Sequence, residues 1–149
     1  MKITYRQAAM DDLEALTKLH TILHNANDGE FYESDKEDMQ NNNMAHFIAL
    51  DGEKVVAFAH VAIRHEYING TNSSPVGMLE GIYVLPEYRK HGIAQQLVLL
   101  CENWVKDRGC IELASDCYLE NTDSLAFHLK IGFIETERII MFSKKLSTE

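Results

Sequence analysis

A short basic turn at residues 89–94, reading Arg-Lys-His-Gly-Ile-Ala, has the residue types and spacing of an anion-binding loop. An apolar, β-branched run ends at Pro86 before it, and an apolar pattern of helical period begins near Ala94 after it. The first N–H groups of a helix lack partners within the helix, and the helix dipole favours negative charge beside them. The turn therefore predicts a site that attracts phosphate, with Gly92 allowing the backbone to come close to the ligand.

Two carboxylates belong to strands predicted on either side of this turn. Glu80 falls in the apolar run before the turn, where a charge is costly unless it has a partner or water. Asp116 lies toward the C-terminal end of a later strand, the end at which ligands gather in open α/β sheets. Such carboxylates can accept hydrogen bonds from ammonium groups and take a proton from an amine. A structural salt bridge or a helix cap is the alternative interpretation of each.

The composition bounds the function. The chain has 46% hydrophobic and 25% charged residues, as ordinary globular proteins do, and its length of 149 residues predicts one domain over residues 1–149. A formal net charge of −9 argues against nucleic-acid binding and favours a cationic small substrate. No apolar run approaches membrane-spanning length and the first residues lack a signal-peptide core, so we expect a cytoplasmic protein without a membrane partner. The seven histidines show no ligand spacing, and we expect no metal.

Hydrophobic periodicity predicts an α/β protein. Strands are expected at residues 3–8, 46–50, 55–67, 111–117 and 135–144, and in the run that ends at Pro86. Helices are expected from Asp11 in capping-box fashion, within 25–43, from 94 to Gly109, and after a cap at 120–123. This order is typical of a mixed sheet with helices on its faces. The acidic residues between 28 and 38 either keep a solvated segment soluble or line an acidic substrate cleft.

The spacing Arg89-x-x-Gly92-x-Ala94 resembles the acyl-CoA pyrophosphate loop of the GNAT family of N-acetyltransferases, and the element order extends this resemblance to the whole chain. The run from Asn121 to Gly132-Phe133 resembles the family's closing segment. The resemblance implies the GNAT fold, with two parallel strands that splay apart at the acyl-CoA site, and acetyl-CoA as co-substrate. The coenzyme contacts that it implies are Ile82, Tyr83, Val84, Lys90, His91, Gly92, Ile93, Ala94, Gln95 and Asn121.

A narrower resemblance links residues 62–70, 73–75, 79–86, 114–116 and 135–138 to the chromosomal-type aminoglycoside 6′-N-acetyltransferases, which confer antibiotic resistance. It implies a homodimer. It also implies aminoglycoside contacts from Tyr67, Glu80, Asp116 and Glu137. The first forty residues match less well, and the tryptophan with which relatives touch the drug near the end of the first helix has no equivalent at residues 20–25.

The chemistry expected from this resemblance is direct attack of a deprotonated amine on the thioester carbonyl, with coenzyme A leaving as thiolate. Glu80, through water, or Asp116 could accept the amine proton, and the residues do not choose between them. The Val84 N–H is a candidate oxyanion donor. His128 stands where many family members place a tyrosine that acts as the general acid. The histidine could donate a proton in its charged form, or it could be a structural histidine.

Three functions therefore compete. The first is an aminoglycoside 6′-N-acetyltransferase, and the second is an acetyltransferase for another amine, such as a polyamine or a protein N-terminus. The third is a regulator that binds acyl-CoA without catalysis. Carboxylates suited to a polycation favour the first two over the third.

Overall fold

The computed structural model describes residues 1–147 and contains one mixed sheet of five strands in the order β1-β2-β3-β4-β5. The first four strands pair antiparallel, and β5 joins β4 in parallel. The strands are β1 (Ile3–Gln7), β2 (Met44–Asp51), β3 (Lys54–Arg64), β4 (Val76–Val84) and β5 (Leu113–Ala114). The α-helices are α1 (Leu13–Leu23), α2 (Tyr32–Met39), α3 (Ile93–Asp107) and α4 (Thr122–Lys130). The chain forms two compact units, residues 1–116 and the residues from 117 onward.

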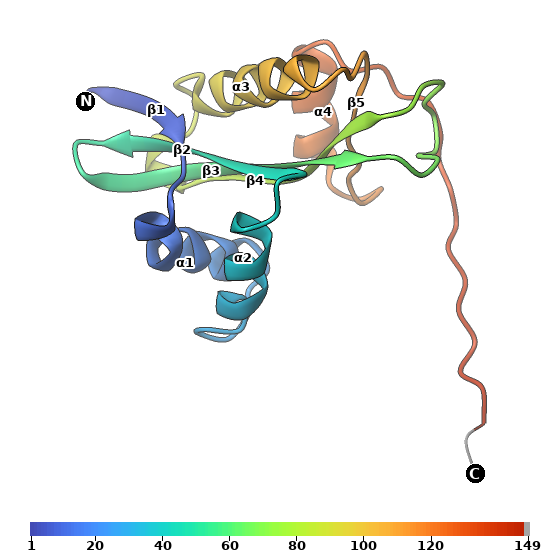
Figure 1. The fold of residues 1–149 in the computed structure, drawn as a ribbon, viewed down its shortest axis with the longest axis horizontal. Coiled ribbons are helices and arrows are strands. Elements are labelled where there is room, and N and C mark those ends of the chain that lie inside the picture. The colour runs from blue at the N-terminus through green and yellow to red at the C-terminus, as the bar shows by residue number, and fades with distance from the viewer. Residues whose placement is uncertain (148–149) are drawn as a thin grey trace. The chain divides into compact units, whose positions relative to one another are not determined.

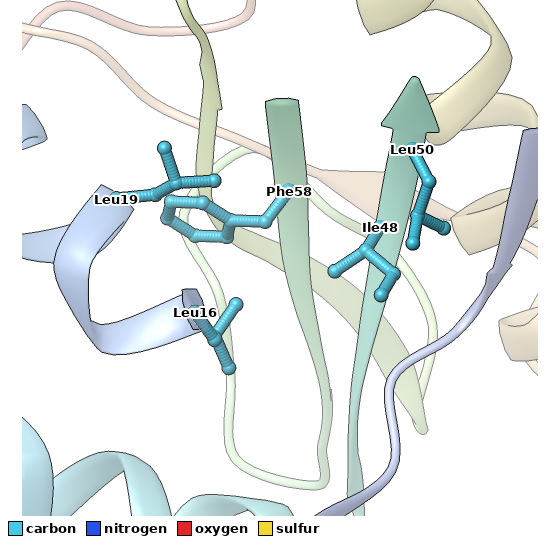
Figure 2. Packing of buried hydrophobic residues seen from close by; sticks show 5 residues of the cluster. All are labelled: Leu16, Leu19, Ile48, Leu50 and Phe58. Carbon is cyan, nitrogen blue, oxygen red and sulfur yellow. The ribbon is translucent and has the colours of Figure 1, made fainter. Parts of the chain in front are cut away.

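In the first unit, helices cover both faces of the sheet. Figure 1 shows α3 on one face and the α1–α2 pair on the other. Beneath α1, Leu16 and Leu19 point toward Phe58 of β3, beside Ile48 and Leu50 of β2 (Figure 2). Because apolar side chains at helical spacing meet alternate side chains of two strands, this cluster joins α1 to the sheet through the hydrophobic effect.

The opposite face is held by α3. Ile93, Leu97 and Trp104 of this helix are buried, as the helical spacing predicts. Gly109 follows the helix with φ at +87°, a left-handed conformation that glycine adopts without steric cost, so the predicted end of the helix is confirmed. None of the helices within residues 1–147 combines the length and the apolar composition needed to cross a bilayer.

Several predicted element boundaries are wrong. Within the described residues β3 ends at Arg64 rather than at 67, and β5 covers only Leu113–Ala114 rather than 111–117. The first helix begins at Leu13 after a 3-10 turn, and the carboxylate of Asp12 accepts the Ala9 N–H at 2.8 Å, so the predicted capping box from Asp11 does not form.

The prediction of a last strand at residues 135–144 is also wrong: the structure describes all of these residues, and they form no strand. Its apolar side chains, including Ile139, Ile140 and Phe142, are exposed. A strand forms through hydrogen bonds to a partner. Alternating apolar residues therefore identified a segment suited to pairing, and they carried no information about whether its own chain supplies the partner.

Two histidines are buried on the α1 side of the sheet. His46 of β2 and His60 of β3 are register partners, and their stacked rings have centroids 4.0 Å apart. Burial, the dominant cause, lowers the pKa of His46 to about 4 and the pKa of His60 to about 3. His20 lowers both pKa values further, whereas the Asp35 carboxylate opposes the shift. The folded protein therefore keeps both rings neutral in mildly acidic solution.

This pair makes stability depend on pH. The unfolded chain protonates both histidines near pH 6.5 and the folded chain does not, so the free energy of unfolding is highest above pH 6.5 and falls toward pH 4. The expected loss is about 1 kcal/mol per histidine per pH unit. Urea unfolding at pH 7, 6 and 5 measures it. The double variant His46→Phe, His60→Phe should show a shallower slope, and an unchanged slope would contradict this origin.

Candidate active site

The predicted splay between two parallel strands is present at β4 and β5. β5 pairs with β4 only at Gly77 and Met78. From Leu79 to Val84, β4 faces no strand on that side among residues 1–147, while β3 pairs with its other side. Such an edge presents main-chain N–H and C=O groups that an amide-bearing ligand can satisfy.

The hydrogen-bond pattern shows which groups point to this open edge. The Leu85 N–H donates to the Val56 carbonyl oxygen at 2.9 Å, so Leu85 and Val56 are a hydrogen-bonded pair. In an antiparallel ladder such pairs alternate with non-bonded pairs. Val84 opposite Ala57 and Ile82 opposite Ala59 are therefore non-bonded pairs, and their N–H and C=O groups point away from β3. Both residues are among the coenzyme contacts that the family resemblance implies.

Glu80 occupies a β-bulge in the same strand. His60 lies opposite Gly81 while Val61 lies opposite Leu79, so Glu80 is the extra residue on β4. Bulges redirect side chains and often lie beside active sites. The Glu80 side chain is 23% exposed, and Arg64 donates to its Oε1 through Nε at 3.0 Å and through Nη2. Both bonds from Arg64 reach Oε1, which leaves Oε2 for a substrate or a water.

The structure confirms the salt-bridge interpretation of Glu80, and its functional role stays a prediction. The salt bridge is real, and Arg64 was not identified from the sequence because pairing of β3 with β4 brings the two residues together. Arg64 also donates to Glu66 at 3.0 Å, so one guanidinium holds two carboxylates. The guanidinium orients Glu80, since two donors of Arg64 hold the same carboxylate oxygen.

Carboxylates of α2 add negative charge near Glu80. Burial, followed by the carboxylates of Asp35, Glu37 and Glu80, raises the pKa of Asp38. Asp35 itself is buried, and its Oδ1 lies 2.9 Å from His20 Nδ1. The acidic segment predicted between 28 and 38 therefore places part of its charge near Glu80. A cationic ligand would relieve this repulsion.

Two further predicted substrate residues lie in the first unit. Tyr67 follows β3 with 72% of its surface exposed, and Asp116 is exposed two residues beyond the end of β5. No hydrogen bond or ion pair within residues 1–147 joins Tyr67, Glu80 and Asp116 to one another. Both exposed side chains can contact a ligand without losing a bond within the protein.

The predicted anion loop has the geometry that its sequence suggested. Gly92 is the N-cap of α3 with φ at +78°, and a Cβ there would meet nothing within 4 Å. The Gln96 N–H makes the first bond of the helix, to the Gly92 carbonyl oxygen at 3.1 Å. The N–H groups of residues 93–95 precede it and so have no partner within the helix. Buried Ile93 fixes this turn to the core, so the donors are held in place.

The second unit contains the remaining predicted residues. The Asn121 side chain accepts the Ser124 N–H at 3.1 Å and caps α4, as predicted. His128 Nδ1 lies 2.7 Å from the Ser124 carbonyl oxygen, which only accepts, so Nδ1 carries a hydrogen. A neutral His128 therefore has its lone pair on Nε2, and only the charged form donates from that atom. Glu137 is exposed in the segment that follows α4.

The described residues bring together no group of three or more His, Cys, Asp or Glu side chains able to hold a metal ion. The chemistry that the first unit supplies is of another kind: main-chain donors at the start of α3, open amide groups at Ile82 and Val84 of β4, and a guanidinium-oriented carboxylate at Glu80 of the same strand. This arrangement suits a long ligand with an anionic end and an amide-bearing arm.

Comparison with known proteins identifies the family. The model of the acetyltransferase (GNAT) family matches residues 8–133. An aminoglycoside N(6′)-acetyltransferase type 1 from Serratia marcescens is 41% identical over 139 residues, covering 91% of this chain and 94% of the relative. Its counterpart from Salmonella typhimurium is 46% identical over 110 residues, 74% of this chain and 76% of the relative.

Solved structures give the same result. AAC(6′)-Iy in complex with the bisubstrate analogue CoA-S-monomethyl-acetylneamine has a TM-score of 0.92 and 38% identity, covering 98% of this chain and all (100%) of that one. AAC(6′)-Ih from Acinetobacter baumannii has a TM-score of 0.92 and 35% identity over 98% of this chain and 100% of that chain. With the splayed strands and the glycine-capped helix both present, the chain belongs to the GNAT family of acetyltransferases, and its fold is the GNAT fold.

Proposed function

We propose that the protein is an acetyl-CoA-dependent aminoglycoside 6′-N-acetyltransferase, which would confer resistance to these antibiotics. One structural observation carries the proposal: the open edge of β4 presents Ile82 and Val84 and also contains Glu80. The backbone groups proposed to hold the thioester and the carboxylate proposed to contact the amine therefore lie on the same strand. The names of the relatives and the bisubstrate complex of AAC(6′)-Iy support the choice of co-substrate and substrate.

Acetyl-CoA is assigned to two segments of the first unit and one residue of the second. The diphosphate accepts hydrogen bonds from the N–H groups at the start of α3, with Lys90 and His91 adding positive charge. The pantetheine arm pairs with the outward-facing backbone of residues 82–84. Asn121 is assigned as a further coenzyme contact; its Oδ1 caps α4, so its amide NH₂ is the group that remains for this role.

The reaction assigned to the site is direct transfer. A deprotonated amine attacks the thioester carbonyl, the amine proton passes to Glu80 through water or to Asp116, and coenzyme A leaves as thiolate. The Val84 N–H points to the open edge and is the proposed oxyanion donor. His128 is the proposed acid for the thiolate, and this role needs its charged form because Nδ1 is bonded to Ser124.

The substrate contacts proposed are Tyr67, Glu80, Asp116 and Glu137. An aminoglycoside carries several ammonium groups, and the negative charge around Glu80 and Asp38 suits such a polycation. The same charge would suit a polyamine, which keeps an acetyltransferase for another amine as the second candidate. A non-catalytic regulator that binds acyl-CoA would have no use for the oriented carboxylate.

One assay separates these functions. Purified protein is mixed with acetyl-CoA and kanamycin, neamine or spermine, and free thiol is followed. The proposal expects thiol release with neamine and kanamycin and acetylation at the 6′-amine, read by mass spectrometry and NMR. Thiol release with spermine alone would replace the drug by a polyamine, and coenzyme binding without release across a broad amine panel would support the regulator.

We also propose that the protein is a cytoplasmic homodimer and that the chain is one acetyltransferase domain. The family match runs through the boundary between the two units, which supports one domain. Apolar side chains of the segment after α4 are exposed, with Ile140, Met141 and Phe142 81–90% accessible, and this exposure supports association. Light scattering after size-exclusion chromatography should give twice the chain mass of 17.0 kDa. A monomer at micromolar concentration would contradict the dimer.

A further inference from the structure

The side chain of Arg89, the first residue of the anion loop, turns back onto β4. Its Nε donates to the Val84 carbonyl oxygen at 2.9 Å, and its guanidinium carbon lies 5.4 Å from the centre of the Tyr83 ring. The planar guanidinium combines a directional hydrogen bond with stacking over an aromatic face, and both contacts hold it against the end of the strand. A basic residue in a phosphate-binding loop would instead be expected to reach for the phosphate.

The chain between the strand and Arg89 is a tight turn. The Tyr88 N–H donates to the Leu85 carbonyl at 2.9 Å and the Arg89 N–H to the Pro86 carbonyl at 3.2 Å. The Tyr88 hydroxyl donates to Asp51 at 2.7 Å, at the end of β2. The turn is therefore fixed to the sheet, and the Arg89 side chain is a second tie, made at the open edge of β4.

The position of this second tie bears on the acyl site. The N–H and C=O groups of Val84 both point to the open edge, and the carbonyl oxygen accepts the hydrogen bond from Arg89. The Val84 N–H is left as the group available to a ligand at this residue. The Val84 carbonyl and the Val84 N–H belong to successive peptide planes that meet at the Val84 Cα, so the hydrogen bond restrains the N–H through the φ and ψ angles of this residue.

We propose that Arg89 is a positioning residue that ties the coenzyme loop, residues 90–95, to the acyl end of β4, residues 82–84, and that it is not a ligand of the diphosphate. The inference rests on the proposed function, in which these two segments hold opposite ends of acetyl-CoA. Arg89 holds the acyl end of β4 and sets the aim of the Val84 N–H. Its loss therefore lowers kcat more than it raises KM for acetyl-CoA.

Two neutral variants separate a hydrogen bond from a charge. Arg89→Met keeps length and removes both, whereas Arg89→Gln keeps an N–H donor that can reach a carbonyl and removes only the charge. The positioning role predicts a loss of kcat of about tenfold in Arg89→Met and substantial recovery in Arg89→Gln. A diphosphate ligand would give equal losses in the two variants, mainly as a higher KM.

A truncated donor sharpens the distinction. S-Acetylpantetheine carries the thioester and the arm without the diphosphate. If Arg89 positions Val84, Arg89→Met lowers kcat/KM for S-acetylpantetheine by about the same factor, roughly tenfold, as for acetyl-CoA. If Arg89 binds the diphosphate, the variant leaves transfer from S-acetylpantetheine at the wild-type rate, and the inference is overturned.

Hydrogen exchange tests the tie without any activity. In the ligand-free protein, the peptide covering residues 82–92 should exchange faster in Arg89→Met than in the wild type, with recovery in Arg89→Gln. Unchanged exchange in Arg89→Met overturns the inference whatever the kinetics show. Should the wild type fail to acetylate aminoglycosides, the proposed function falls, while the exchange result still decides the role of Arg89.

Discussion

Glu80→Gln is expected to lower kcat for aminoglycoside acetylation by about a hundredfold, because glutamine cannot accept the amine proton from a bound water. The fold should survive. The Glu80 side chain is 23% exposed and its partner Arg64 is 35% exposed, and partly exposed ion pairs contribute about 1 kcal/mol or less. Steady-state kinetics with acetyl-CoA and neamine, together with a urea unfolding curve, measure both effects.

Glu66→Gln is the matched control for this change. Glu66 accepts a hydrogen bond from the same Arg64 at 3.0 Å, and its side chain is 61% exposed. The control removes one carboxylate from the same guanidinium and leaves the bulge of β4 alone. Equal kcat losses in the two variants would mean that Glu80 acts only through Arg64. Asp116→Asn, measured beside them, shows which carboxylate carries the larger share of the proton transfer.

Gly92→Val is expected to raise the Kd for coenzyme A at least about tenfold, a loss of roughly 1.4 kcal/mol of binding. Gly92 has φ at +78°, and its Cβ would enter open space at the start of α3, where the diphosphate is assigned. A valine there is strained, and relaxing that strain moves the N–H donors of the next residues. Isothermal titration with coenzyme A measures the change.

Gly109→Val separates strain from ligand contact. Gly109 follows the same helix at its other end, with φ at +87° and open space around a Cβ. Both valines should destabilise the protein to a similar extent, about 1–2 kcal/mol. Only Gly92→Val should weaken coenzyme binding. Equal Kd values for the two variants would contradict the assignment of the diphosphate to this turn.

Features encoded by a few neighbouring residues were predictable from the sequence. Gly92 at the start of α3, Gly109 at its end and the Asn121 cap of α4 each depend on a local backbone conformation that few residue types adopt. The helical spacing likewise predicted most of the buried positions of α3, because a helix turns at a fixed period.

Features that depend on pairing between distant segments were not predictable. The bulge at Glu80 exists because β3 pairs with β4 in a shifted register, and Arg64 reaches Glu80 for the same reason. Within residues 1–147, β5 pairs with β4 only at Gly77 and Met78 and residues 135–144 form no strand, outcomes that alternating apolar residues do not reveal. The fold-back of Arg89 depends on a turn whose closure the composition does not specify.

The central claim is that main-chain N–H groups at the start of α3 bind the diphosphate of acetyl-CoA and place the thioester along the open edge of β4. A crystal structure of the protein with coenzyme A tests it most directly. The account predicts diphosphate oxygens within hydrogen-bond distance of the N–H groups of residues 92–95, with the pantetheine amides paired to Ile82 and Val84. A coenzyme bound away from Gly92, or with its arm off β4, would contradict it.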